Sequence, residues 1–190
     1  TLKYFMHKAF DDMVQAGKTR EVIFGSEVGA AFHIAFEAMK AQLPGGGNYR
    51  FVDTGAVTPT RAAMEGDQID IAMVPMGVIK DSVAAGRLNV LAFFSGKKRS
   101  KFAPEIPTMT ELGVNVYMPK FFFLAMPKGT PQSRAEVIRN ALKKMADDPK
   151  FIKEAEDLAY TPGYLAPEDL YEMEQVNFEL MSKYSKAIKK

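Results

Sequence analysis

The stretch from Gly25 to His33 contains the residues whose types and spacing offer the most chemistry in this sequence. Ser26 could act as a nucleophile and His33 as its base, a pairing used in group transfer. About two helical turns, or about 10 Å along a helix axis, separate the two residues. No third member of a triad is evident. A small hydrolase or transferase is therefore a weak interpretation of this pair.

The same stretch could instead bind an anion through its backbone. A helix predicted to begin at Ala30 leaves about four N–H groups without intrahelical partners and carries partial positive charge at that end. Small residues at Gly29, Ala30 and Ala31 would let a carboxylate approach, and the Ser26 hydroxyl could donate to it. A tight turn between strand and helix explains the glycines equally well. The spacing matches neither a phosphate loop nor a G-x-S-x-G elbow, so both interpretations stay open.

Two other polar residues have structural interpretations. His33 is predicted to share a polar helix face with Glu37 and Lys40, which favours a structural or surface role over catalysis. Asp70 stands alone in an apolar strand, so we expect it to brace that strand through hydrogen bonds. Because the sequence has no cysteine and only His7 besides His33, no metal-binding cluster and no cofactor site is indicated.

Helices and strands are predicted to alternate over the first half of the chain, as in a twisted α/β sheet with helices on both faces. The second half is rich in helices, and we place a boundary between Val116 and Lys120. The expected helices cover residues 2–16, 30–43, 58–64, 77–85, 130–147, 149–158 and 167–190, and the expected strands cover 21–24, 49–52, 69–74, 89–94 and 120–126.

Composition narrows the classes of function. The net charge is only +2 and the basic residues are scattered, so no nucleic-acid partner is expected. No apolar run approaches the roughly 18 residues that a membrane span requires. The lack of cysteine fits an oxidising compartment without establishing one. The sequence shows no signal peptide, and residue 1 has the character of a cut rather than a natural start.

Several short segments, in a fixed order over about residues 22–146, resemble the substrate-binding receptors of tripartite tricarboxylate transporters, the Bug receptors. Each segment is weak, and the order and spacing carry the resemblance. The segments are Phe24-Gly25-Ser26 with Gly29 and His33-Ile34-Ala35, Gly55-Ala56 with Arg61 to Met64, Gly66 to Asp70, Ala84 to Leu88, Lys98-Arg99-Ser100, Pro104 to Thr108, Glu111-Leu112-Gly113 and Ala125 to Pro131.

This resemblance implies a periplasmic-binding-protein-like (type II) bilobal α/β fold. Residues 18–117 would form one complete inserted lobe with a twisted mixed sheet. Residues 1–17 and 118–190 would form part of the outer lobe, whose N-terminal half is missing. The resemblance also implies a periplasmic receptor rather than an enzyme, one that binds a small carboxylate between its lobes and delivers it to membrane transporter subunits. A fragment of this kind could form a homodimer through the surface left uncovered.

The resemblance places the ligand at three loops that follow strands. The expected ligand-binding residues are Ser26, Glu27, Gly29 and Ala30, then Thr54, Gly55 and Ala56, then Val74, Pro75 and Met76. The chain departs from the family pattern at all three loops: Glu27 is added, Asp53-Thr54 replaces a Tyr-Lys/Arg pair, and Val74 stands where an Asp is common. Acidic residues near such a site would repel a dicarboxylate by about 1 kcal/mol or more each.

Two consequences are left open by those acidic residues. Either Glu27 and Asp53 point away from the loops, or the ligand also carries an amine or hydroxyls.

A rival function with the same fold is the effector-sensing domain of a regulator. A DNA-binding or sensor segment upstream would favour the regulator, and a secretory signal peptide would favour the receptor.

Overall fold

A computed structural model describes residues 2–96, 98–118 and 122–188, with the side chains of 9–96, 98–118 and 122–186. Residues 1–119 together with 175–190 form one compact unit, and residues 120–174 form a second. The predicted α/β class is confirmed, whereas the assignment of residues 18–117 to an inserted lobe and of 1–17 and 118–190 to an outer lobe stays a prediction. The side chains of Leu2, Phe5 and Met6, which supported the first helix, lie outside the described residues.

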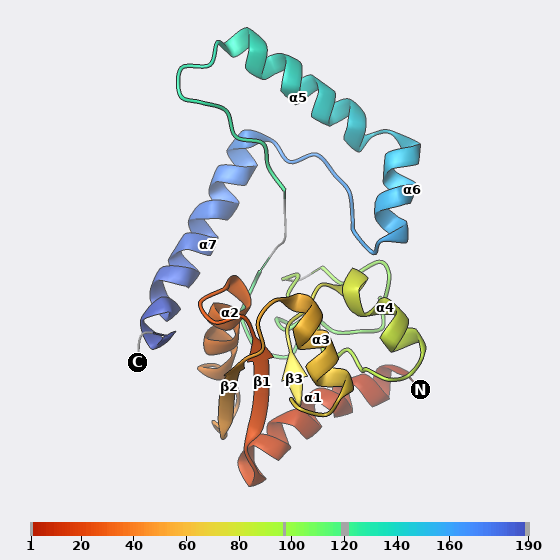
Figure 1. The fold of residues 1–190 in the computed structure, drawn as a ribbon, viewed down its shortest axis with the longest axis vertical. Helices are drawn as coiled ribbons and strands as arrows, with labels where there is room; N and C mark the ends of the chain where they lie inside the picture. The colour runs from red at the N-terminus through yellow and green to blue at the C-terminus, as the bar shows by residue number, and fades with distance from the viewer. Residues whose placement is uncertain (1, 97, 119–121, 189–190) are drawn as a thin grey trace. The chain divides into compact units, whose positions relative to one another are not determined.

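The first unit contains a three-stranded sheet in the order β2-β1-β3. Both strand pairs are parallel, so the mixed sheet expected from the sequence is not found among the described strands. Each strand leads into a helix, in the β-α rhythm that the turn residues predict (Figure 1). The elements are α1 (Leu2–Thr19), β1 (Val22–Ser26), α2 (Ala31–Lys40), β2 (Tyr49–Asp53), α3 (Val57–Glu65), β3 (Ile71–Ala72) and α4 (Met76–Ala84).

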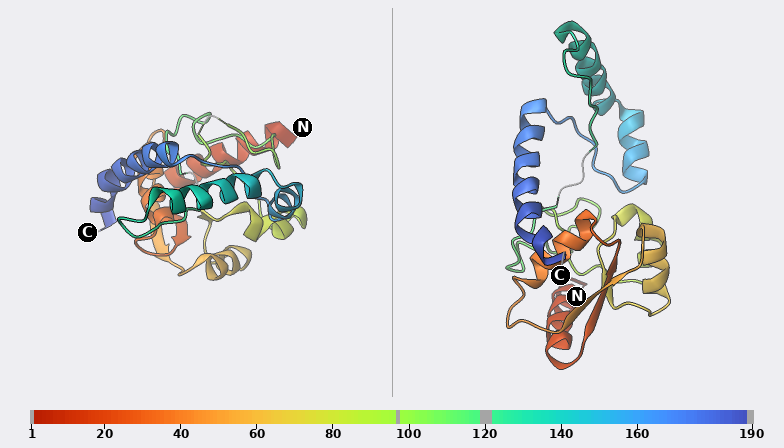
Figure 2. Two further views of the ribbon diagram at one scale, coloured as in Figure 1. Left: turned by 90° about the horizontal axis from the view of Figure 1, so that it is seen from above. Right: turned by 60° about the vertical axis from the view of Figure 1, so that its left-hand side comes forward.

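One face of the sheet is covered by α1 and α2, and the other by α3 and α4, as the right-hand view of Figure 2 shows. Alternate residues of β1, Val22 and Phe24, are almost fully buried on the α1/α2 face. The Phe24 ring stacks on Phe36 of α2 with centroids 4.2 Å apart. This cluster also includes Phe10, Met13, Val14, Ala35, Ala38, Met39, Leu43, Tyr49, Met73, Met109, Val114 and Val116. Burial of this apolar area therefore fixes the two helices on β1.

Gly25 permits a close approach on the opposite face of the sheet. A Cβ atom built at Gly25 would lie 2.5 Å from Ile69 Cδ1 and 3.0 Å from Thr54 Cγ2. Real Cβ atoms do not tolerate such contacts, so any larger residue would push these side chains away. The glycine in the middle of this strand thus leaves room for the side chains of Ile69 and Thr54.

The expected strand over 89–94 does not form. Within the described residues this segment makes one isolated parallel bridge, between Phe93 and Thr108. Phe93 N–H donates to the Pro107 carbonyl, and Met109 N–H donates to the Phe93 carbonyl. Pro104 and Pro107 have no N–H to donate, so a longer ladder along this segment is not available. The strand expected over 69–74 is likewise shorter, at Ile71–Ala72.

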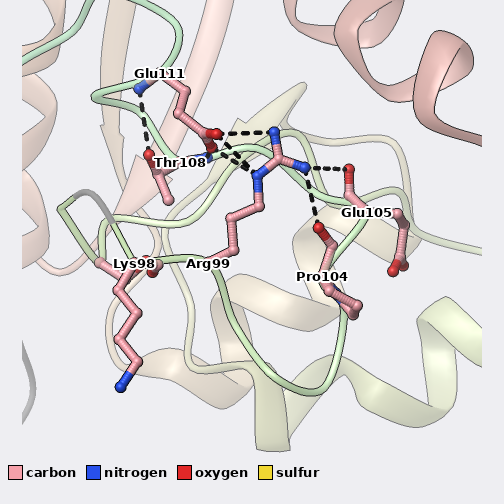
Figure 3. A network of polar contacts seen from close by, with 7 residues as sticks. Lys98, Arg99, Pro104, Glu105, Thr108 and Glu111 are labelled. Carbon is pink, nitrogen blue, oxygen red and sulfur yellow. Dashed lines mark hydrogen bonds and ion pairs between the residues drawn. The ribbon is translucent and has the colours of Figure 1, made fainter.

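A polar network holds the irregular segment that follows (Figure 3). Arg99 Nε donates to both carboxylate oxygens of Glu111 at 2.9 Å, and its Nη1 donates to the Pro104 carbonyl at 3.0 Å. Thr108 and Glu111 bond reciprocally: Thr108 N–H donates to Glu111 Oε2 at 2.8 Å, and Glu111 N–H donates to Thr108 Oγ1 at 3.2 Å. The T-x-x-E spacing is that of a capping box, used here to hold a turn. Arg99 above all lowers the pKa of Glu111 to about 2.

The second unit contains α5 (Gln132–Ala146), α6 (Pro149–Asp157) and the first residues of α7 (Pro167–Ile188). Ala135 is the one buried hydrophobic residue in its described part, so this unit has no apolar core of its own. Leu180 and Tyr184, in the part of α7 that belongs to the first unit, contact the core described above. None of the described helices combines the length and apolarity needed to cross a membrane.

The strand expected over 120–126 is absent from residues 122–126, and residues 120 and 121 lie outside the described part of the chain. Phe122, Phe123 and Leu124 are exposed, at 79%, 61% and 63%. A strand requires a neighbouring strand whose backbone N–H and C=O groups form hydrogen bonds with its own. No described strand lies beside this segment, so an apolar sequence alone does not make it a strand.

Candidate functional site

The carboxyl edge of the sheet brings the three predicted loops together. Because the strands are parallel, β1, β2 and β3 all end at this edge, and α2, α3 and α4 all begin there (Figure 1). The register pairs Ser26, the last residue of β1, with Asp53, the last residue of β2. Open α/β sheets usually place ligands at such an edge. The three loops are therefore neighbours in space although they are far apart in sequence.

No side chain caps the start of α2, α3 or α4. The residues at the three cap positions are Ala30, Ala56 and Pro75, and none makes a side-chain hydrogen bond to the helix. Within the described residues, no acceptor is bonded to the first two amides of each helix, which belong to Ala31, Phe32, Val57, Thr58, Met76 and Gly77. Three helix starts with unsatisfied amides give this edge a partial positive charge.

The loop between β1 and α2 differs from the expected anion-binding site in one respect. Its own amides already have acceptors within the chain: Gly29 N–H donates to His33 Nδ1 at 3.1 Å, and Ala30 N–H donates to the Glu27 carbonyl at 3.3 Å. Gly29 has φ of +76°, a left-handed conformation that favours glycine. The amides left open therefore lie one position further along, at Ala31 and Phe32.

His33 does not lie on a polar helix face, so that prediction is wrong. The side chain is only 6% exposed, and its ring stacks on Phe51 of β2 with centroids 3.5 Å apart. Burial lowers the pKa of His33, against the opposing effect of the charges on Glu37 and Asp53. A ring nitrogen that accepts from Gly29 N–H is unprotonated, so the neutral ring carries its proton on Nε2. The structural role favoured for His33 is thus confirmed.

Ser26 and His33 do not form a catalytic pair. Ser26 is 3% exposed, and no hydrogen bond joins it to His33 in the described part of the chain. The Ser26 carbonyl accepts from Thr54 N–H at 3.0 Å, which ties the first loop to the second. Ser26 accordingly joins the two loops through its carbonyl, and no base among the described residues bonds to its hydroxyl.

Asp53 is the residue of this edge that the sequence pattern did not identify as a site residue. Its Oδ1 accepts from Val28 N–H at 3.3 Å and from Gly55 N–H at 3.0 Å. A carboxylate of the protein itself therefore bonds to amides of two of the three loops. One of the two alternatives left open by the sequence required Asp53 to point away from the loops. The structure shows the opposite for Asp53. The Asp-Thr-Gly sequence is that of an Asx turn and could have indicated the bond to Gly55.

The second and third loops are shaped by their own contacts. Thr54 and Thr60 share a hydrogen bond of 2.7 Å between their hydroxyls, and the Thr60 hydroxyl also bonds to the Ala56 carbonyl. Gly55 has φ of +71°. In the third loop, Val74, Pro75 and Met76 are half-buried. Thr54, Gly55 and Ala56 follow β2, and Val74, Pro75 and Met76 follow β3; the contact of these residues with a ligand stays a prediction.

Asp70 lies at the opposite, amino end of the strands. Its carboxylate receives two hydrogen bonds from Arg20, at 2.6 and 3.0 Å, and a third from Ile23 N–H at 2.8 Å. The bond from Arg20 is the main cause of the lowered pKa of Asp70. The bracing role predicted for Asp70 is confirmed. No group of three or more His, Cys, Asp or Glu side chains in the described residues could hold a metal ion.

Comparison with known proteins shows what this chain is similar to. The model of the family described as "Tripartite tricarboxylate transporter family receptor" matches residues 4–189. A crystal structure of a TctC solute binding protein from Polaromonas matches with a TM-score of 0.73 at 20% identity, and an R. palustris protein solved with adipate matches with 0.78 at 18% identity. Each of these matches covers 94% of this chain and 60% of the other.

Two curated relatives are also similar. A UPF0065 protein from Cupriavidus necator is 32% identical over 83 residues, which is 44% of this chain and 25% of the relative. A second UPF0065 protein, from Bordetella pertussis, is 24% identical over 155 residues, which is 81% of this chain and 46% of the relative. The chain thus spans less than half the length of these relatives.

Proposed function

The chain belongs to the tripartite tricarboxylate transporter receptor family, and from this premise we propose that it binds a small organic carboxylate as part of an extracytoplasmic solute receptor. The family and the solved neighbours are solute-binding proteins rather than enzymes. The carboxylate would bind at the carboxyl edge of the sheet, where α2, α3 and α4 begin. In this proposal the family's other properties, delivery to membrane transporter subunits and a periplasmic location, extend to this chain.

The single observation that supports this proposal most is the set of three uncapped helix starts at one sheet edge. Each start presents backbone N–H groups, and the helix dipoles favour a negative charge there. The amides of Ala31 and Phe32, beside the half-buried Ala30, are the proposed donors to the carboxylate. The small side chains of Ala30 and Ala31 would leave the amides accessible.

Binding between two lobes and self-association of the fragment belong to the same proposal. The weak core of the second unit supports self-association, because Val137, Leu158 and Tyr171 of this unit are all exposed by more than half. An effector-sensing role in a regulator would use the same sheet edge. No feature of the described residues favours that role, so the receptor is the function that we adopt.

The proposal can be tested with the substitution Ala30→Asp in the full chain. An aspartate at the helix start accepts hydrogen bonds from the first-turn amides and stabilises the helix by about 0.5–2 kcal/mol. It would therefore occupy the proposed donors while leaving the fold intact. Ser133→Asp is the matched control, because it adds a carboxylate to the first turn of α5, a helix of the second unit that contains none of the three loops.

The assay is thermal unfolding with increasing concentrations of glutarate, L-glutamate, adipate and 6-aminohexanoate. A ligand at 100 times its dissociation constant stabilises the folded state by about 2.7 kcal/mol. We expect at least one of these carboxylates to stabilise the wild-type chain and the Ser133→Asp variant, but not the Ala30→Asp variant. The proposal is wrong if none stabilises the wild type, or if Ala30→Asp responds as the wild type does.

A further inference from the structure

We propose that Asp53 determines the class of ligand, so that the site takes a carboxylate which also carries an ammonium group rather than a purely anionic di- or tricarboxylate. This inference rests on the proposed function and names the ligand class of the same site. It starts from two hydrogen bonds that join neighbouring loops. One carboxylate oxygen of Asp53 bonds to Val28 of the first loop and Gly55 of the second.

The two amide bonds fix where the charge of Asp53 lies. Both donate to the same oxygen, Oδ1, so the carboxylate is held at the carboxyl edge of the sheet, where β2 ends. The other oxygen, Oδ2, has no hydrogen-bond partner in the described part of the chain, and the residue is exposed. Oδ2 therefore presents a charged acceptor to solvent or to a ligand.

No positive side chain neutralises Asp53. Among the described residues, no ion pair includes it. Arg50, on the same strand, pairs with Glu21 near the other end, at 2.6 Å. His33, in the first turn of α2, is buried, and its Nδ1 accepts a hydrogen bond from Gly29 N–H. Glu27 in the same loop is exposed and adds a second negative charge.

Amide donors and a carboxylate that has no ion-pair partner among the described residues thus belong to the same edge of the sheet. The α2 amides at Ala31 and Phe32 suit a carboxylate, and Asp53 Oδ2 suits an ammonium. Val28, whose amide bonds to Asp53, lies three residues before Ala31, and three residues of chain span at most about 11 Å. A second carboxylate in the place of the ammonium would meet a like charge a few ångströms away, which costs affinity. A zwitterionic carboxylate matches both groups.

A purely structural role for Asp53 makes a different prediction. In that case the side chain only joins the two loops, and its substitution changes the affinity for all carboxylates in the same direction. The two roles are separated by ligand pairs that differ in a single charged group. L-Glutamate differs from glutarate by an added ammonium, and 6-aminohexanoate differs from adipate by an ammonium in place of one carboxylate.

The experiment measures the dissociation constants of these four compounds by calorimetry with the full chain and with Asp53→Asn. Asparagine keeps the size of the side chain and an oxygen that accepts from Val28 and Gly55, and it removes the charge. Asp12→Asn is the matched control, because Asp12 is an exposed residue of α1 and lies outside the loops.

In the wild type and in Asp12→Asn we expect the ammonium-bearing member of at least one pair to bind about tenfold more tightly. In Asp53→Asn we expect that preference to fall to near one or to reverse. Wild-type binding of glutarate and adipate as tight as that of their partners would overturn the inference and leave the proposed function standing. A preference unchanged by Asp53→Asn would overturn the role of Asp53. Absence of binding by all four compounds would overturn the proposed function and this inference together.

The wild-type preference does not depend on the stability of any variant. If Asp53→Asn fails to fold, Glu27→Gln provides a second test, because it removes the acidic charge of the first loop. No side-chain hydrogen bond of Glu27 occurs in the described part of the chain. We expect Glu27→Gln to reduce the preference for the ammonium-bearing ligand, by a smaller factor than Asp53→Asn does. An unchanged or a larger preference would contradict the electrostatic argument.

Discussion

Replacement of His33 by phenylalanine should make the stability of this protein less dependent on pH. Phenylalanine retains a ring that can stack on Phe51, as the imidazole does with centroids 3.5 Å apart. It removes the Nδ1 atom that accepts from Gly29 N–H at 3.1 Å. Loss of one hydrogen bond should cost about 0.5–1.5 kcal/mol at neutral pH. The pH dependence provides the sharper test.

Burial is the main cause that lowers the pKa of His33, and the charges of Glu37 and Asp53 partly oppose it. The folded protein therefore binds this proton less readily than the unfolded chain, whose histidine titrates at about pH 6.5. Stability from this group is fully present above about pH 6.5 and is lost as the pH falls from there towards the folded pKa. The slope for one proton is at most about 1.4 kcal/mol per pH unit.

The measurement is urea unfolding of the wild type and His33→Phe between about pH 7.5 and about pH 5.0, a range that brackets the histidine pKa. We expect the wild type to be more stable at the upper end and the two curves to approach each other by up to about 1.4 kcal/mol per pH unit below about 6.5. His7 is present in both proteins, so its titration cancels in the difference. Parallel curves, or an NMR titration that places the pKa of His33 at or above about 6.5, would refute the reasoning.

Two further predictions concern the scaffold of the site. Gly25→Ala should destabilise the fold by about 1–3 kcal/mol, because the new Cβ would meet Ile69 Cδ1. Combining it with Ile69→Val, which removes Cδ1, should recover part of that loss in a double-mutant cycle by urea unfolding, and strictly additive effects would contradict the steric argument. Glu111→Gln should flatten the fall in melting temperature as the pH drops from about 4.5 towards 2, because the hydrogen bonds of Arg99 hold the pKa of Glu111 at about 2. Glu179→Gln, at an exposed residue of α7, is the control, and an equal effect of both substitutions would exclude the Arg99–Glu111 pair as the cause.

The sequence predicted most of the helices and the strands β1 and β2, because periodicity and turn residues act over a few neighbours. Gly29 and Gly55 marked the turns between strands and helices, whereas Gly25, which was expected to end the first strand, lies inside β1. The helix starts then had to meet at one edge, since consecutive β-α units in a parallel sheet place every loop on the same side. The resemblance to a receptor family followed from the order of these same short segments.

Two apolar runs show where local pattern was insufficient. Residues 89–94 and 122–126 have the composition of strands and do not form them. The first meets a segment with prolines at Pro104 and Pro107, and the second has no described strand beside it. Strand formation depends on a partner elsewhere in the chain, which composition does not encode.

By itself the sequence determined the order of most elements and the alternation of strands and helices, whereas the parallel pairing that puts the three loops at one sheet edge came from the tertiary structure. Only the tertiary structure decided which amides of those loops stay open. The parallel register of β1 and β2 brings Asp53 to Val28, 25 residues away in sequence, and the stacking on Phe51 buries His33. Hydrogen-bond partners and burial are set by contacts between distant residues, so no local pattern could show that a carboxylate of the protein already bonds to two of the loops.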